Sequence, residues 1–265
     1  IKRWKHYYRT KEDIVDEITD FESRWWKEVV LTWVNLCAWW LEHTNDFKNS
    51  KFDELIKNII KKTEIPRIRI SSLWPEFVND KVLKLFENKR IYPHFHYSIQ
   101  SWSSNVLKNM KRHYDWEYMR DLLKKTLNIK REDWVKVSIW ADLIVWFPKE
   151  SEEDFIDTYN LVKDWLIMKV HAFPFSNHTL WEHVPASFFP HQIDEKIKKQ
   201  RLDKLLNLSE EIRNDFINKN IWDTLEVLIE SVKDWEFKWW SENYIECNNN
   251  NFEIISWKIA KNEIV

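Results

Sequence analysis

The absence of glycine constrains this chain more than any other feature of its sequence. The 265 residues include no glycine and 19 tryptophans. An average protein contains about 7% glycine, so roughly 19 glycines are missing. Glycine enters left-handed turns at little steric cost, whereas a bulky side chain does so only with strain. A compact chain of this length therefore needs another explanation for its turns.

The tryptophans stand where glycine is expected. Four of them follow an aspartate, as glycine does in the common Asp-Gly turn, namely Trp116, Trp134, Trp165 and Trp235. We interpret most tryptophans as glycine positions, either because UGA encodes glycine in this gene or because glycine was deliberately replaced. The alternatives are a genuinely tryptophan-rich protein and a literal sequence that does not fold, since strain and overpacking accumulate at many sites.

The bulk composition indicates a globular chain with enough apolar residues for a core. Apolar residues make up 44% and charged residues 32%. The formal net charge is -2, so the overall charge does not indicate a nucleic-acid partner. No run of 18 apolar residues occurs, so we expect no membrane span. Cys37 and Cys247 form neither a metal-spaced pair nor a disulfide framework, which fits a reducing cytoplasm.

Helical and strand patterns alternate along most of the chain. The predicted helices cover 11–23, 51–62, 79–88, 103–111, 117–127, 151–164 and about 191–217. The predicted strands cover 29–32, 67–70, 94–99, 135–145 and 168–173. This β-then-α order predicts an α/β fold with a parallel sheet or barrel, whose active site lies at the C-terminal ends of the strands.

The pattern changes after about residue 219. Short strands are expected at 224–232, 242–247 and 252–260, separated by turn sequences. We therefore predict one α/β unit over residues 1–218 and a small all-β, OB-like unit over residues 219–265.

Four segments carry a family resemblance once tryptophan is read as glycine. Residues 27–40 become KEVVLTGVNLCAGG, 67–77 become RIRISSLGPEF, 93–114 begin PHFHYSIQSGSS, and 138–154 become SIGADLIVGFPKESEED. In this order and spacing they resemble the radical-SAM methylthiotransferases, the MiaB-like family. The C-terminal segment resembles the TRAM domain that follows the radical-SAM (β/α) barrel in these enzymes.

The resemblance is greatest to the MtaB-like branch. Thr32 to Asn35 and Arg69 to Ser72 look like the branch that acts on threonylcarbamoyladenosine beside the tRNA anticodon. The alternatives are the branch that modifies an aspartate of a ribosomal protein and a non-catalytic RNA-binding remnant. The resemblance implies addition of a 2-methylthio group by radical chemistry, with S-adenosylmethionine and [4Fe-4S] clusters as cofactors. It implies tRNA, an electron donor and a sulfur donor as partners, no membrane partner, a cytoplasmic location and a monomer.

The family's CxxxCxxC cluster motif is absent from this sequence. Arg3-Trp4 looks like the Arg-Gly pair that closely follows that motif in the family, so we interpret the chain as a C-terminal piece that begins just past the cluster cysteines. Because thiolates are needed to hold such a cluster, we expect no cluster binding and no activity from this piece alone. Lys149 also departs from the family, which commonly has glycine after Phe-Pro.

The resemblance and the strand ends together indicate a cofactor pocket. Most of its candidate residues follow predicted strands, Asp142 lies within one, and Arg112 follows a predicted helix. The candidates are Asn35, Ser71, Ser72, Gln100, Ser101, Ser103, Arg112 and Asp142. Each has an alternative role: the serines as strand-end turns, Arg112 in a surface ion pair, and Asp142 as the buried partner of an arginine such as Arg67 or Arg69.

The remaining polar clusters are assigned by the same reasoning. Asn243 and Tyr244 lie in a run like the TRAM signature and are the candidate RNA-binding residues. His94 and His96 alternate along one strand, and His171 lies further on. Because no carboxylate or cysteine is evident to complete a ligand set, we predict no metal site among them.

Overall fold

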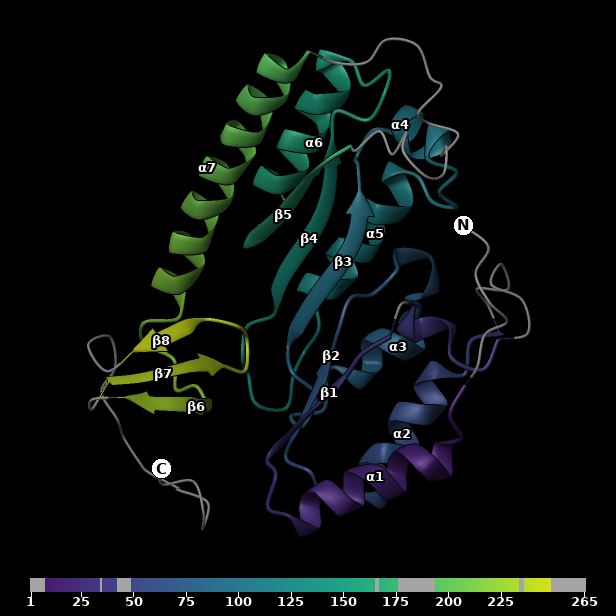
Figure 1. Ribbon diagram of the computed structural model, residues 1–265, viewed down its shortest axis with the longest axis vertical. Helices are drawn as coiled ribbons and strands as arrows, with labels where there is room; N and C mark the ends of the chain where they lie inside the picture. Colours follow the sequence, from purple (N-terminus) through teal and green to yellow (C-terminus); the bar gives the residue numbers. More distant parts are fainter. Residues whose placement is uncertain are drawn as a thin grey trace.

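The protein is described by a computed structural model that covers residues 8–33, 35–41, 49–164, 167–175, 194–233 and 236–248. Two parallel sheets and their helices form a continuous α/β core, and a small antiparallel sheet lies below the long helix α7 (Figure 1). None of the described helices has both the length and the apolar character needed to cross a membrane.

The first sheet pairs two short parallel strands. Strand β1 (Glu28–Leu31) lies beside β2 (Arg67–Ile70), with Glu28 opposite Arg67. Helix α1 (Lys11–Ser23) begins at a capping box in which Thr10 accepts from the backbone N–H of Asp13. It packs against α2 (Phe52–Lys62), so the two helices cover this end of the molecule.

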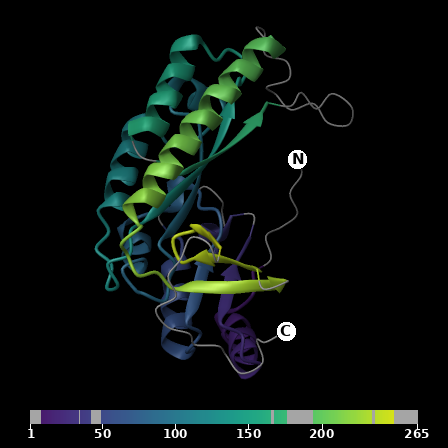
Figure 2. The ribbon, with the colours of Figure 1, turned by 90° about the vertical axis from the view of Figure 1, so that its left-hand side faces the viewer.

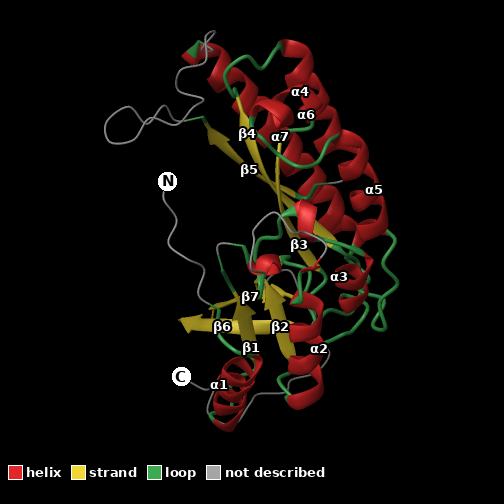
Figure 3. Ribbon diagram, turned by 90° about the vertical axis from the view of Figure 1, so that its right-hand side faces the viewer, coloured by secondary structure: helices red, strands yellow, loops and turns green. Residues whose placement is uncertain are grey.

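The second sheet supplies the longer strands. It has the order β3 (His94–Gln100), β4 (Ser138–Val145) and β5 (Lys169–Pro174), all parallel. Figure 3 shows α5, α6 and α7 on one side of these strands. The connecting helices are α3 (Asp80–Leu85), α4 (Ser104–Asn109), α5 (Trp116–Leu127), α6 (Glu152–Asp164) and α7 (Glu195–Lys219).

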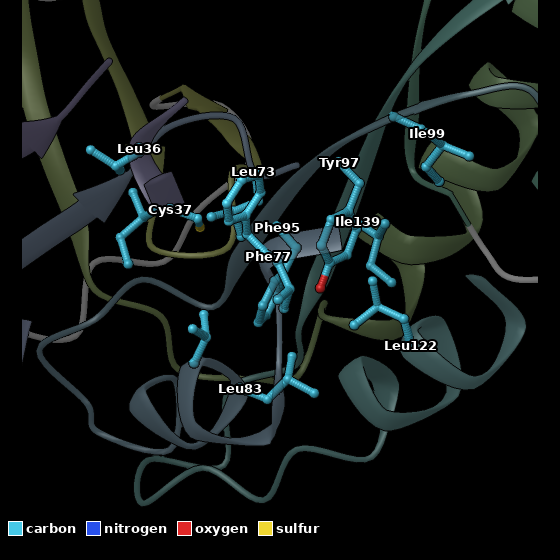
Figure 4. Packing of buried hydrophobic residues seen from close by; sticks show 14 of the residues in the cluster. Leu36, Cys37, Leu73, Phe77, Leu83, Phe95, Tyr97, Ile99, Leu122 and Ile139 are labelled. Carbon is cyan, nitrogen blue, oxygen red and sulfur yellow. The ribbon is translucent and has the colours of Figure 1, made fainter. Parts of the chain in front are cut away.

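The sequence predicts a parallel sheet or a partial barrel, and no closed barrel forms among the described residues. The two parallel sheets are separate and meet only through isolated bridges, such as Leu73 with Tyr97. One apolar cluster nevertheless runs across both sheets. Figure 4 shows Leu73 and Phe77 packed beside Phe95 and Tyr97. Tyr97 is fully buried, and its hydroxyl lies 2.8 Å from Thr126 Oγ1, so this polar atom keeps a partner inside the core.

The C-terminal unit is an antiparallel sheet of β6 (Val227–Lys233), β7 (Glu236–Ser241) and β8 (Glu246–Asn248). Figure 2 shows it beneath α7 and near the first sheet. The strand predicted at 242–247 is only partly present, because residues 242–243 form a turn and β8 begins at Glu246. The strand predicted at 252–260 lies outside the described residues.

The backbone supports the interpretation of several tryptophans as glycine positions. Among the described residues, eight have positive φ, and four of these are Trp25, Trp40, Trp134 and Trp146. Their φ angles lie between 62° and 69°, in the left-handed region that favours glycine. Trp116 differs, because it is the first residue of α5 rather than a turn residue. Trp165 and Trp235 lie outside the described residues.

Candidate functional site

Two unpartnered polar atoms lie at the C-terminal ends of the first sheet. Asn35 follows β1, is 6% exposed, and its Oδ1 has no hydrogen-bond partner among the described residues. Ser71 follows β2, and its backbone N–H donates to Leu31 O at 3.0 Å, which places it beside the end of β1. Its Oγ is likewise buried without a described partner. Because buried polar atoms are normally paired, these two suit a polar ligand at this edge.

The end of β3 is a tight turn rather than an open polar surface. Gln100 has a φ of 70°, and the register between β3 and β4 is irregular just before it. Ser101 is fully buried, and its Oγ accepts from the N–H of Ser103 at 3.2 Å. Ser103 caps α4 by accepting from Val106 N, and its hydroxyl donates to the Asp154 carboxylate. The two serines therefore shape the turn, and Gln100 is the partly exposed member of the group.

A hydrogen-bonded network crosses the middle of the second sheet. His96 Nε2 lies 2.7 Å from Asp142 Oδ1, and His171 Nδ1 lies 3.4 Å from the same oxygen. Ser98 Oγ donates to Asp142 Oδ2 at 3.1 Å, and Ser72 Oγ lies 3.1 Å from His96 Nδ1. Burial opposes ionisation of Asp142, but the hydrogen bonds from His171 and His96 hold the pKa of its carboxyl well below the usual range.

The sequence predicted only some of the residues of this network. Asp142 and Ser72 were candidates, whereas Ser98 and His171 were not placed with them. Strand register is the missing information, because β4 and β5 pair Asp142 directly with His171. His94 points to a different partner, since its Nδ1 lies 3.0 Å from Ser138 Oγ.

The arginine candidates have other partners. Arg67 and Arg69 both pair with Glu28, at 3.3 Å and 3.0 Å, rather than with Asp142. The guanidinium carbon of Arg112 lies 5.3 Å from the ring centre of Trp74. The alternative in which Asp142 is the buried partner of an arginine is therefore wrong, because histidines and a serine contact it instead.

The loop after β4 is fixed by a buried ion pair. The N–H of Trp146 donates to Glu150 Oε2 at 2.6 Å, and Arg201 Nη1 of α7 donates to the same atom at 2.8 Å. Lys149 has a φ of 72°, so the backbone here takes the form that the glycine of relatives would favour. Burial raises the pKa of Glu150 to about 7, and Arg201 opposes that rise.

Asn243 is buried and Tyr244 is partly buried where the antiparallel sheet meets the α/β core. Asn243 is fully buried, and its Nδ2 donates to Asn220 Oδ1 at 3.1 Å and to Lys136 O at 3.3 Å. The ring of Tyr244 lies 4.0 Å from that of His94, and the Arg69 guanidinium lies 4.2 Å above it. The structure thus gives both residues a part in joining the antiparallel sheet to the α/β core.

Glu242 beside this contact makes stability depend on pH. It is 7% exposed, and burial raises its pKa to about 7 from the ordinary 4.5. The native state therefore binds the extra proton between these values, and stability falls as pH rises from about 4.5 to about 7. We expect Glu242→Gln to increase the free energy of unfolding at pH 8 by up to about 3 kcal/mol, with little change at pH 4.

Urea unfolding of both proteins at pH 4, 6 and 8 measures this difference. The exposed Glu211 on α7 provides the control, and Glu211→Gln should shift stability equally at all three values. A Glu242→Gln variant with the same pH dependence as the parent would contradict the prediction.

The two cysteines do not fit an iron–sulfur cluster. Cys37 follows β1 and Cys247 lies in β8, and both side chains are fully buried. Burial raises the pKa of Cys37, which disfavours the thiolate that binds iron. The cluster cysteines are therefore not among these residues.

Comparison with known proteins assigns the family. A sequence model of the Radical SAM superfamily matches residues 1–162, which is more than half of the 265 residues. The chain belongs to the radical SAM superfamily. This membership supports S-adenosylmethionine and iron–sulfur clusters as the cofactors of its chemistry, and it agrees with the parallel α/β architecture.

Similarity to individual curated proteins identifies the group of enzymes within this superfamily that the chain resembles. The threonylcarbamoyladenosine tRNA methylthiotransferase MtaB of Bacillus subtilis is 30% identical over 264 residues, 97% of this chain and 56% of the relative. MtaB of Aquifex aeolicus is 32% identical over 243 residues, 91% and 55%. The tRNA-2-methylthio-N(6)-dimethylallyladenosine synthase of Alkaliphilus oremlandii is 32% identical over 235 residues, 86% and 46%.

These matches support the resemblance to the methylthiotransferases and, within them, to the MtaB-like branch. The chain spans about half the length of the curated relatives it matches.

Proposed function

We propose that this chain is part of a tRNA methylthiotransferase that adds a 2-methylthio group to threonylcarbamoyladenosine beside the anticodon. The observation that carries the proposal is similarity to the Bacillus subtilis MtaB along 97% of the chain. Its partners are then tRNA, an electron donor and a sulfur donor, and its location is the cytoplasm. The Alkaliphilus relative acts on a different tRNA adenosine at similar identity, so the dimethylallyl substrate is the second candidate.

The C-terminal ends of the first sheet are the proposed cofactor edge. S-adenosylmethionine, when bound, supplies the methyl group and the radical chemistry of this family. Asn35 Oδ1 and Ser71 Oγ are the atoms that would contact its polar groups, because both atoms are buried and lack partners among the described residues. Gln100 lies at the end of the neighbouring sheet, and the Glu150–Arg201 pair holds the loop after β4.

The antiparallel sheet is the proposed TRAM-like unit, within residues 219–265. Because Asn243 is buried, we assign it to docking of this unit and expect any RNA contact to come from other residues of the unit. Cys37 and Cys247 do not fit the ligand set of the iron–sulfur cluster, because both are buried.

The test uses the complete gene that encodes this chain, expressed in a bacterium that lacks its own threonylcarbamoyladenosine methylthiotransferase. Mass spectrometry of digested tRNA should show 2-methylthio-threonylcarbamoyladenosine. A methylthio group on dimethylallyladenosine instead would favour the second candidate. Methylthiolation of an aspartate in a ribosomal protein would assign the chain to the branch that modifies that protein. If no new modification is detected, the result would favour a non-catalytic RNA-binding remnant.

Asn35→Ala and Ser71→Ala in the same gene test the proposed cofactor edge. Each removes one polar contact to the bound cofactor, so we expect about tenfold weaker binding of S-adenosylmethionine to the purified, cluster-loaded protein by equilibrium dialysis. Ser23→Ala on the exposed surface of α1 is the control and should leave binding unchanged. Unchanged affinity in both test variants would remove the first sheet from the cofactor site.

A further inference from the structure

We propose that His96, Asp142 and His171 bind one divalent transition-metal ion of the Zn²⁺ type and leave at least one coordination position open. The three side chains come from the adjacent strands β3, β4 and β5. Their ligand atoms all lie within 4.8 Å of one another. Sequence patterns alone do not join them, because the carboxylate that completes the histidine set comes from β4 and only the sheet register places it there.

The donor set has the right chemistry for such an ion. Two imidazole nitrogens and one carboxylate oxygen are ligands that zinc and ferrous ions use in proteins. Metal–ligand bonds of about 2.0–2.2 Å place two tetrahedral ligands about 3.3 Å apart. His171 Nδ1 and Asp142 Oδ1 are already 3.4 Å apart. His96 Nε2 is 2.7 Å from that oxygen and must withdraw by only about 0.6 Å, which side-chain rotation can provide.

The surrounding hydrogen bonds orient the ligands as a metal site requires. Ser72 Oγ lies 3.1 Å from His96 Nδ1, so this nitrogen can carry the proton and donate to the serine while Nε2 faces the ion. Ser98 Oγ donates to the second oxygen of Asp142 at 3.1 Å. The rings of His96 and His171 stand nearly perpendicular, at 86° and 5.0 Å between centres. Such outer partners fix the tautomer and ring direction of metal-binding histidines.

Partial exposure favours an open site over a closed structural one. The side chains of His96, Asp142 and His171 are 19%, 18% and 30% exposed, so an ion and water can reach them. Structural zinc sites normally use four protein ligands, whereas sites with three keep a position for water or a substrate atom. His94 is not a fourth ligand, since it is buried against Ser138, and Lys169 is directed to the ring of Trp140 at 4.4 Å.

Direct metal binding tests the site without reference to methylthio transfer. The 265-residue chain is stripped with a chelator, desalted and titrated with Zn²⁺ by calorimetry, then with Co²⁺ while its visible absorption is recorded. We expect one ion per chain and a Co²⁺ spectrum of low coordination number. Asp142→Asn and His171→Gln should weaken binding at least 100-fold, and Ser72→Ala should weaken it about 10- to 100-fold through the orientation of His96.

The control is His113→Gln, because His113 is an exposed histidine outside the cluster, and it should bind as the parent does. Circular dichroism melts establish that each variant is folded. If Asp142→Asn does not fold, the test depends on His171→Gln, at a more exposed ligand, and on Ser72→Ala, at a residue outside the ligand set. Absence of stoichiometric binding overturns the proposal, as does full affinity in folded His171→Gln and Ser72→Ala proteins.

Discussion

Replacing Trp25, Trp40 and Trp134 together by glycine should raise the free energy of unfolding by about 3 kcal/mol. All three have positive φ, at 69°, 65° and 62°, and all are exposed, at 55%, 45% and 89%. The left-handed conformation costs a non-glycine residue roughly 1–2 kcal/mol, and glycine removes this cost. Glycine also gives the unfolded chain more conformational freedom, which offsets part of the stabilisation. A net gain of about 1 kcal/mol per position is expected to add, because the three lie in separate turns.

A matched control is Trp116→Gly. Trp116 is also exposed and also follows an aspartate, but it begins α5 with helical geometry, and the Arg120 guanidinium lies 4.7 Å from its ring centre. Glycine there should lower stability by up to about 1 kcal/mol. Urea unfolding of the parent, the triple variant and the control measures both effects. A destabilised triple variant would show that these tryptophans belong in their turns and would remove the glycine interpretation for them.

Arg201→Met should lower the free energy of unfolding at pH 8 by about 3–5 kcal/mol, because it leaves the buried Glu150 carboxylate without its cation. The side chain of Glu150 has no exposed surface, and that of Arg201 is 7% exposed. The loss should be smaller at pH 5. The pKa of Glu150 is already about 7 in the intact pair, so its carboxyl is then protonated and needs no cation.

Arg213→Met on the same helix is the control, because its pair with Glu210 is much more exposed, at 33% and 59% of the two side chains. It should cost less than about 1 kcal/mol. Adding Glu150→Gln to Arg201→Met should recover part of the lost stability, since no charge then remains buried. Equal losses in the two arginine variants, or no dependence on pH, would show that the Arg201 pair does not hold the loop after β4.

Local patterns predicted most of the secondary structure. The helix at 11–23 and the strand at 67–70 have the predicted bounds, because a capping box marks the start of the first and β-branched isoleucine occupies every second position of the second. Strand β7 was missed since Glu236–Ser241 carries two adjacent tryptophans in a stretch interpreted as a turn. The interpretation of tryptophans as turn glycines therefore hid this strand.

The candidate site was also predicted only in part. Parallel β-then-α order was enough to place Asn35 and Ser71 at strand ends, because the C-terminal ends of parallel strands share one edge. The assignment of Ser101 and Ser103 to the cofactor could not anticipate that a turn and a helix cap use their hydroxyls. The partners of Asp142 depend on which strands are neighbours and in which register, and no local pattern contains that information.

The sequence by itself determined the alternation of strands and helices, the family, and several of the backbone positions that favour glycine. These follow from the spacing of apolar residues and from the sterics of single residues, which are local properties. Only the tertiary structure decided that His96 and His171 meet Asp142, that Arg201 neutralises Glu150, and that Asn243 is buried. Each of these contacts joins residues distant in sequence, and chain packing sets their distances.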